Sequence, residues 1–280
     1  MKPAPFEYCR PDTLEEAVEL LAEFGDDALV MSGGLSLGAM LNMRMVRPEA
    51  VIDINRIQQL SQIDIIGKEL RIGALARQEH VLASPDCQAA APLLIKGLKN
   101  VGHYQTRSRG TVGGSVAHAD PSAEIPLCLT AQNGEIELTS KRGIRRVKPT
   151  DFFRGALITD CKVDEIVTAL VMPVMQAGTG IAFEEINERH GDFAIVAAAA
   201  WAVRDGDNLC YGLGLGGLDD HPLAIHGTTT GKLEPIQEAV TTIVCNSEPL
   251  DDRRASATYR RHLAAHLGER TLQQALETAS

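Results

Sequence analysis

Two glycine-rich stretches, about 80 residues apart, constrain this chain more than any other feature of its sequence. The first is Ser32-Gly33-Gly34-Leu35-Ser36, and the second is Arg109-Gly110-Thr111-Val112-Gly113-Gly114-Ser115. Glycine permits positive φ and close backbone approach, so successive N–H groups can face one concavity, and the neighbouring hydroxyls add donors. Either stretch alone is explained by a tight turn. The pair favours two turns that hold the pyrophosphate of a nucleotide cofactor from both sides, without a lysine or arginine.

The pattern around the first 175 residues is that of a mixed α and β region. Thr13 and Glu16 are spaced as a capping box before an apolar stripe, and Gly25 is a plausible stop for that helix. Apolar runs predict strands at 28–31, 51–54, 70–74 and 135–139, and the first of them leads directly into the first glycine-rich stretch. Helices are expected at 78–83, 87–101 and 124–131.

A segment that contains proline and glycine, Pro173 to Gly180, is typical of a domain boundary. We therefore expect an α+β fold in two parts, residues 1–175 and 176–280. Residues 181–186, 194–203 and 208–218 favour an antiparallel meander, although the alanine-rich middle segment could also be helical. Helices are expected at 236–244 and 255–276. Gly212-Leu213-Gly214-Leu215-Gly216-Gly217 matches a dinucleotide-binding pattern, but Pro222 follows too soon for the required helix, which favours a glycine-rich strand or turn.

Composition narrows the classes of partner. The formal net charge of −10 argues against a protein that binds nucleic acid, because such proteins need basic patches to neutralise phosphates. No apolar run is long enough to span a bilayer, and the N-terminus lacks the apolar stretch of a signal peptide. The six cysteines are scattered without a Cys-x-x-Cys pair, which predicts free thiols in the cytoplasm and no iron–sulfur or zinc site.

The two stretches and their surroundings resemble the FAD-binding medium subunits of molybdenum hydroxylases, such as carbon monoxide dehydrogenase and bacterial xanthine dehydrogenase. Ser32-Gly33-Gly34-Leu35-Ser36-Leu37, with Arg47-Pro48 and Val51-Ile52-Asp53-Ile54 downstream, is similar to the first FAD motif of that family. The second glycine-rich stretch, continued by Ala117 to Glu124, resembles the second motif. His190-Gly191-Asp192-Phe193-Ala194 resembles a landmark near the start of the C-terminal domain.

The resemblance implies a set of residues that hold FAD. The backbone of the two motifs would bind the pyrophosphate and ribityl region, and Glu124 stands where the family has a carboxylate near the ribityl chain. Phe193 stands where relatives place a residue beside the isoalloxazine, which could gate access of an acceptor. Some relatives have a lysine where this chain has Ile195. The backbone residues implied are Ser32, Gly33, Gly34, Leu35, Ser36, Leu37, Thr111, Val112, Gly113, Gly114 and Ser115.

The resemblance also implies a fold and an activity. The first part would be an FAD-binding domain of the vanillyl-alcohol-oxidase (PCMH) type, and the second a carbon monoxide dehydrogenase flavoprotein C-terminal domain. Relatives work as heteromers with a small iron–sulfur subunit and a large molybdopterin subunit. The chain would pass electrons from iron–sulfur clusters through FAD to NAD or another acceptor, while a partner hydroxylates the substrate.

Two alternatives stay open at this point. The chain could be a self-contained flavoenzyme, similar to UDP-N-acetylenolpyruvoylglucosamine reductase, which would need an internal acid and a sugar-nucleotide site. It could also be an assembly module that has lost its flavin, although both glycine motifs are intact. The substrate of the complex and the terminal acceptor are not indicated by the sequence.

Overall fold

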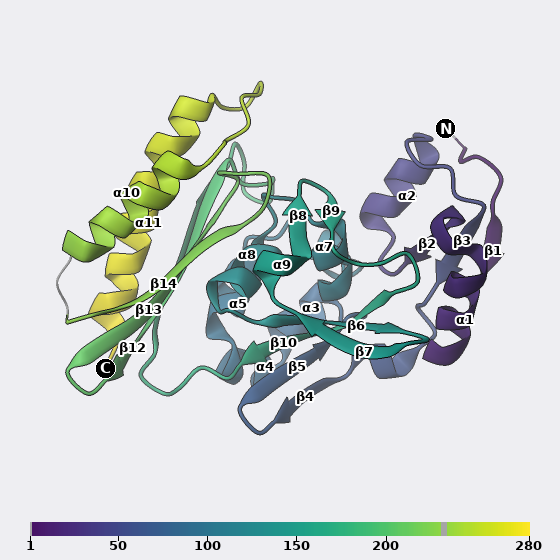
Figure 1. Cartoon of the computed structure of the whole chain (residues 1–280), viewed down its shortest axis with the longest axis horizontal. Coiled ribbons are helices and arrows are strands. Elements are labelled where there is room, and N and C mark those ends of the chain that lie inside the picture. The colour runs from purple at the N-terminus through teal and green to yellow at the C-terminus, as the bar shows by residue number, and fades with distance from the viewer. Residues whose placement is uncertain (1, 231–233) are drawn as a thin grey trace.

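The computed structural model describes residues 2–230 and 234–280, and its described part combines helices with four sheets (Figure 1). The N-terminal block is a three-stranded parallel sheet in the order β1-β3-β2, flanked by two helices. Its elements are β1 (Glu7–Cys9), α1 (Leu14–Phe24), β2 (Ala28–Met31), α2 (Leu35–Asn42) and β3 (Ala50–Asp53). Helix α1 begins where expected, because the Thr13 hydroxyl accepts a hydrogen bond from the Glu16 N–H at 3.2 Å.

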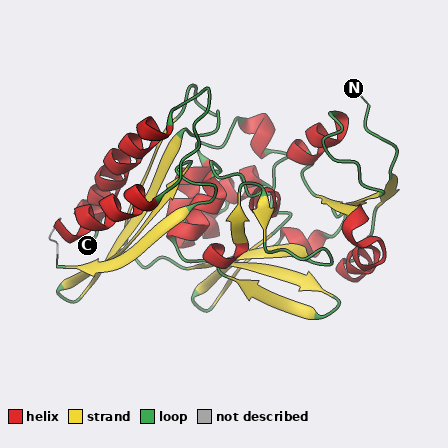
Figure 2. Cartoon of the chain, turned by 45° about the horizontal axis from the view of Figure 1, so that its top comes forward, coloured by secondary structure: helices red, strands yellow, loops and turns green. Residues whose placement is uncertain are grey.

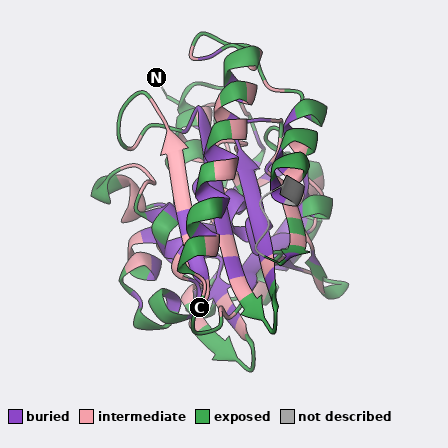
Figure 3. Cartoon of the chain, turned by 90° about the vertical axis from the view of Figure 1, so that its left-hand side faces the viewer, coloured by how far each residue is buried: buried purple, intermediate pink, exposed green. Residues whose placement is uncertain are grey.

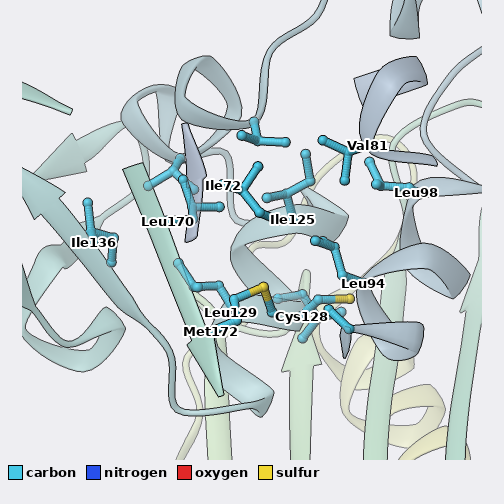
Figure 4. Close-up of a cluster of buried hydrophobic side chains, with 14 of the residues drawn as sticks. Ile72, Val81, Leu94, Leu98, Ile125, Cys128, Leu129, Ile136, Leu170 and Met172 are labelled. Carbon is cyan, nitrogen blue, oxygen red and sulfur yellow. The ribbon is translucent and has the colours of Figure 1, made fainter. Parts of the chain in front are cut away.

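The middle block is a five-stranded antiparallel sheet in the order β4-β5-β10-β6-β7, covered by short helices. Its strands are β4 (Ile63–Ile66), β5 (Glu69–Gly73), β6 (Glu135–Ser140), β7 (Gly143–Val147) and β10 (Ile166–Pro173), with a separate hairpin of β8 (Phe153–Gly155) and β9 (Ile158–Thr159). Its helices are α3 (Gln78–Ala83), α4 (Pro85–Ala90), α5 (Pro92–Leu98), α6 (Tyr104–Arg107), α7 (Val112–His118), α8 (Glu124–Ala131) and α9 (Pro149–Phe152). Figure 4 shows their shared core, where side chains of α5 and α8 meet those of β5 and β10.

The C-terminal block is a four-stranded antiparallel meander with helices on both faces (Figures 1 and 2). Its elements are β11 (Gly180–Ile186), β12 (Val196–Asp205), β13 (Asn208–Gly216), β14 (Leu223–Thr229), α10 (Glu234–Asn246) and α11 (Ala257–Thr278). Helices α10 and α11 cover one face, while α5 and α8 of the middle block cover the other. Figure 3 shows the buried sheet behind the two terminal helices, whose outer sides are exposed.

Burial on both faces explains the alanine-rich strand. Ala197 and Ala199 belong to the core shared with the middle block, whereas Ala198 and Ala200 belong to the core under α10 and α11. A strand packed closely from both sides reads as a continuous apolar run instead of an alternating one. The segment that could have been helix or strand is therefore the strand β12. The glycines at 212–216 lie in β13, as expected for a glycine-rich strand.

The expected α+β fold is confirmed, and two local expectations are wrong. Residues 87–101 do not form one helix, because α4 ends at Ala90 and Pro92 starts α5, where its missing N–H is tolerated. The second glycine-rich stretch is not a turn, because Thr111 caps α7 and Gly113 and Gly114 lie in its first turn. Within the described residues, no helix is long and apolar enough to cross a membrane.

Candidate functional site

The fold brings the two glycine-rich stretches into direct contact. The hydroxyls of Ser32 and Thr111 are 3.0 Å apart and share a hydrogen bond. Glycine is required at the contact, because a Cβ on Gly33 would lie 2.4 Å from the Arg109 carbonyl oxygen. A Cβ on Gly114 would lie 2.7 Å from the Thr111 hydroxyl and 2.9 Å from the Ser32 hydroxyl. The pairing of the two stretches that the sequence predicted is therefore present.

The first stretch ends in a helix N-terminus with free donors. Strand β2 ends at Met31, and Gly34, with φ of +73°, turns the chain into α2. Among the described residues, none accepts a hydrogen bond from the N–H groups of Leu35, Ser36 or Leu37. The side chains of Leu35 and Ser36 are exposed, and that of Leu37 is half-buried. Free N–H groups at the start of a helix, with its dipole behind them, form a site for a phosphate or another anion.

The second stretch has a different role from the expected one. The Val112 N–H donates to the Ala76 carbonyl at 3.1 Å, and the Gly113 N–H donates to the Ala74 carbonyl at 3.0 Å. The Gly114 N–H donates to the Thr111 hydroxyl at 3.0 Å. The expectation that the N–H groups of this stretch point at a pyrophosphate is therefore wrong for these residues. A Cβ on Gly113 would lie 2.4 Å from the Ala74 Cβ, so this glycine lets α7 pack against the end of β5. Ser115 is half-buried in the same turn of the helix.

A polar network that the sequence did not indicate holds the first stretch in place. Asn55 donates to the Ser32 carbonyl at 2.7 Å, and its amide oxygen accepts from Arg77 at 2.7 Å. Arg77 also donates to the Arg109 carbonyl at 2.7 Å, and Arg109 donates to the Gly33 carbonyl at 3.3 Å. Two arginines therefore lie beside the contact, contrary to the expectation of a site without cations. Burial, followed by the charge of Arg109, lowers the pKa of Arg77.

Asp53 anchors this network from the end of β3. Its carboxylate accepts from the Asn55 backbone N–H at 2.9 Å and from the Asn55 side-chain amide, and also accepts from the Tyr8 hydroxyl. Burial alone would raise the pKa of Asp53, but the hydrogen bonds from Tyr8 and Asn55 lower it below the ordinary value. An ionised Asp53 therefore fixes Asn55, which in turn fixes the backbone of the first stretch.

The remaining two predicted residues lie toward the C-terminal block. Glu124 is the first residue of α8 and is 5% exposed, and burial raises its pKa to about 8. Phe193 is 50% exposed in the loop between β11 and β12, and its carbonyl accepts from Arg254. This loop is tied to the segment that follows α7, because the buried Arg260 donates to the carbonyls of both Ile195 and Gly217, and the Gly217 N–H donates to Pro121.

The geometry fits a long, anionic cofactor. Free helix N–H groups with two nearby arginines suit a pyrophosphate, and the Ser32, Thr111 and Ser115 hydroxyls suit polar groups beside it. A buried carboxyl and an exposed aromatic residue lie farther along, toward the C-terminal block. Among the described residues, one group could hold a metal ion. It comprises Asp219, Asp220 and His221, of which Asp220 is exposed and the other two are half-buried, and it lies outside this site.

Two family models cover most of the chain. Residues 4–175 match the FAD binding domain in molybdopterin dehydrogenase, and residues 181–275 match the CO dehydrogenase flavoprotein C-terminal domain. The 6-hydroxypseudooxynicotine dehydrogenase complex subunit alpha of Paenarthrobacter nicotinovorans is 33% identical over 287 residues, which cover 100% of this chain and 97% of that protein. The carbon monoxide dehydrogenase medium chain of Hydrogenophaga pseudoflava is 33% identical and covers 98% of both chains.

Solved structures agree with these matches. Carbon monoxide dehydrogenase from Hydrogenophaga pseudoflava contains a chain that superposes with a TM-score of 0.95, at 32% identity and with 100% of both chains covered. A chain of quinoline 2-oxidoreductase from Pseudomonas putida 86 superposes with a TM-score of 0.90, at 29% identity and with 99% of both chains covered. These relatives are subunits of multi-subunit oxidoreductases. The chain therefore belongs to the family of FAD-binding medium subunits of the molybdenum hydroxylases.

Proposed function

We propose that this chain binds FAD where its two glycine-rich stretches meet, and that it relays electrons within a molybdenum hydroxylase. The observation that carries the proposal is the unpaired set of N–H groups at the start of α2. The Ser32 hydroxyl of the same stretch bonds that of Thr111, and Arg77 and Arg109 lie beside it. Those N–H groups would hold the pyrophosphate, with Ser32, Thr111 and Ser115 beside it. The backbone around the pyrophosphate would be shaped by Gly33, Gly34, Val112, Gly113 and Gly114. Glu124 and Phe193 would lie along the ribityl chain and the ring.

The proposed relay needs little chemistry from the protein itself. FAD supplies the redox step when it is bound, because it can accept electrons singly and release them in pairs. The residues of this chain bind the pyrophosphate, orient the ring toward Phe193 and limit the access of water. The electrons would come from a small iron–sulfur subunit, and a large molybdopterin subunit would carry the substrate. NAD is one candidate acceptor. Relatives named for nicotine, caffeine and carbon monoxide oxidation show that substrates vary across the family.

Two further parts of the proposal concern the domain boundary and the cellular location of the chain. We propose a boundary between residues 175 and 176, which is supported by the positions of the two family matches. The six cysteines are free thiols in the structure, and a cytoplasmic location stays a prediction. The self-contained flavoenzyme is the alternative, and it would show reduction of the bound flavin by its own substrate without any partner.

The cofactor should be bound without a covalent link. Neither glycine-rich stretch contains a histidine or cysteine, the side chains that commonly link a flavin. Acid precipitation of the purified chain should therefore release the yellow chromophore into the supernatant, and chromatography should identify it as FAD rather than FMN. Flavin retained in the pellet would contradict a non-covalent site, and a colourless protein that does not bind added FAD would contradict the proposed function.

A further inference from the structure

Glu124, which is buried, and Glu185, which is half-buried, lie between the middle block and the C-terminal sheet. Apart from its own backbone N–H, no described residue donates a hydrogen bond to the Glu124 carboxyl. One oxygen of Glu185, on β11, accepts from the Asn187 side chain at 2.8 Å. The other, Oε2, is buried and has no partner among the described residues. An acceptor without a donor at a buried position is costly, so this pair requires an explanation.

Glu124 and Glu185 lie at one junction, between α5, α8 and β11. A Cβ on Gly97 of α5 would lie 3.4 Å from the Phe183 ring and 3.6 Å from the Glu124 Cβ, so β11 and α8 meet there. Side chains alternate along a strand, so Glu185 lies on the same face of β11 as Phe183. Cys128, one turn after Glu124, lies in the buried cluster beside this junction (Figure 4).

The neighbouring Glu184 lies on the opposite face of β11. Its carboxylate accepts from Arg270 and, at 2.8 Å, from Gln274, both on α11. Glu184 therefore has cationic and polar partners, and it is an internal comparison for Glu185 on the same strand.

The charged groups around the junction do not neutralise the pair. Burial, together with the smaller effect of the charges of Glu185 and Asp120, raises the pKa of Glu124 to about 8, and burial raises that of Glu185 to about 7. On α5, the Lys96 amine donates to the Ile181 carbonyl at 3.1 Å, and burial keeps the Cys128 thiol neutral by raising its pKa. Among the described residues, no cation forms an ion pair with Glu124 or Glu185.

We propose that Glu124 and Glu185 are electrostatically coupled across this junction, and that FAD binding beside Glu124 favours the protonated form of the pair. The second part rests on the proposed FAD site. A bound pyrophosphate adds negative charge, and a bound flavin excludes water from Glu124. Both effects favour the protonated pair, since two unpaired buried carboxylates repel each other. Glu185 is then a positioning residue that couples the C-terminal block to the flavin site, and the affinity for FAD falls as the pH rises above neutrality.

Calorimetry of FAD binding in two buffers with different ionisation enthalpies tests the proposal, because it counts protons directly. The full native chain should take up as much as about one proton per FAD near pH 8, and its Kd should rise by as much as about tenfold per pH unit above that point. Glu124→Gln should remove the proton uptake and flatten the pH dependence, and Glu185→Gln should lower the uptake, because Glu124 then loses the charge of Glu185. Glu184→Gln, which changes the solvent-side partner of Arg270, should keep the native proton count.

The outcomes separate this inference from the proposed function. Equal proton counts in the native and Glu185→Gln chains, both with bound FAD, would overturn the inference and leave the FAD site intact. Absence of FAD binding at every pH would overturn the proposed function, and the melting temperature of the flavin-free chain would then test the pair itself.

The sign of that stability effect follows from the raised pKa values. A carboxyl whose pKa is raised in the folded state stabilises the chain below its unfolded pKa, and this stabilisation is lost as the pH rises through about 7 to 8. Glutamine stays neutral, so Glu185→Gln should melt at the same temperature as the native chain near pH 5 and several degrees higher, about 2–4 °C or more, near pH 9. Equal melting temperatures across this range would rule out the coupled pair of protonated carboxyl groups.

Discussion

Replacement of Gly114 by valine should weaken FAD binding by about a hundredfold or more, which corresponds to roughly 2.8 kcal/mol. The new Cβ would lie 2.7 Å from the Thr111 hydroxyl and 2.9 Å from the Ser32 hydroxyl, so the hydrogen bond that joins the two stretches must open. Gly114 lies inside α7 and is not among the residues with positive φ. The effect is therefore steric and displaces the start of α2 relative to α7, without a cost in backbone strain.

Fluorescence titration of the flavin-free chain with FAD measures this effect. Gly38→Ala is the matched control, because Gly38 lies in α2 beyond the free N–H groups and an added Cβ would contact nothing within 4 Å. This control should bind FAD as tightly as the native chain. Circular dichroism should show that the Gly114→Val chain keeps its secondary structure. Native affinity in a well-folded Gly114→Val chain would show that the contact between the stretches is not needed for binding.

The sequence was most informative where a local pattern determines the structure. Three elements depend on contacts within a few residues or on one burial pattern. They are the cap at Thr13, helix α8 and the strand that leads into the first stretch. The contact between the two stretches was also predictable, because both have the same unusual composition of glycine and hydroxyl residues. Such composition has few explanations other than a shared site.

The roles inside the contact could not be predicted in the same way. Gly113 is needed because Ala74 lies behind it, and the hydrogen bonds of Val112 and Gly113 go to the chain after β5. These partners depend on how α7 packs against the five-stranded sheet, which no local pattern encodes. Arg77 and Asn55 were missed for the same reason. Each is an isolated polar residue in the sequence and becomes part of the site only through the fold.

The division of roles between the two stretches follows from this difference in packing. Both end at a helix N-terminus, but α7 is buried against the sheet and its first N–H groups are used by the protein. Helix α2 lies at the edge of the N-terminal block (Figure 1), with Leu35 and Ser36 exposed and its first N–H groups free. The first stretch therefore offers donors to a ligand, while the second holds the first in position. The FAD affinity should accordingly depend on the backbone of α2 and on the side chains of α7.

The 280-residue chain, reconstituted with FAD, should hydroxylate no organic substrate on its own. The proposed function places hydroxylation in a partner subunit, and the family matches at 4–175 and 181–275 account for nearly all of these residues. The six cysteines are free and scattered, whereas an iron–sulfur cluster needs clustered thiolates. We expect at most a transfer of electrons from NADH to an artificial dye, and turnover with substrate only after both partner subunits are added.

The measurement is the absorbance of the bound flavin during anaerobic mixing with xanthine-like, heteroaromatic and aldehyde substrates. A flavin that stays oxidised with all of them, and becomes reduced when the partners are added, is the result expected of a relay. Dithionite reduction of the same sample is the control that the flavin is competent. Rapid reduction by any one substrate without partners would instead identify a self-contained flavoenzyme, because the electrons could then have entered only through a substrate site on this chain. The exposed surface at Phe193 would be the first place to look for such a site, since that is where the proposed ring position meets solvent.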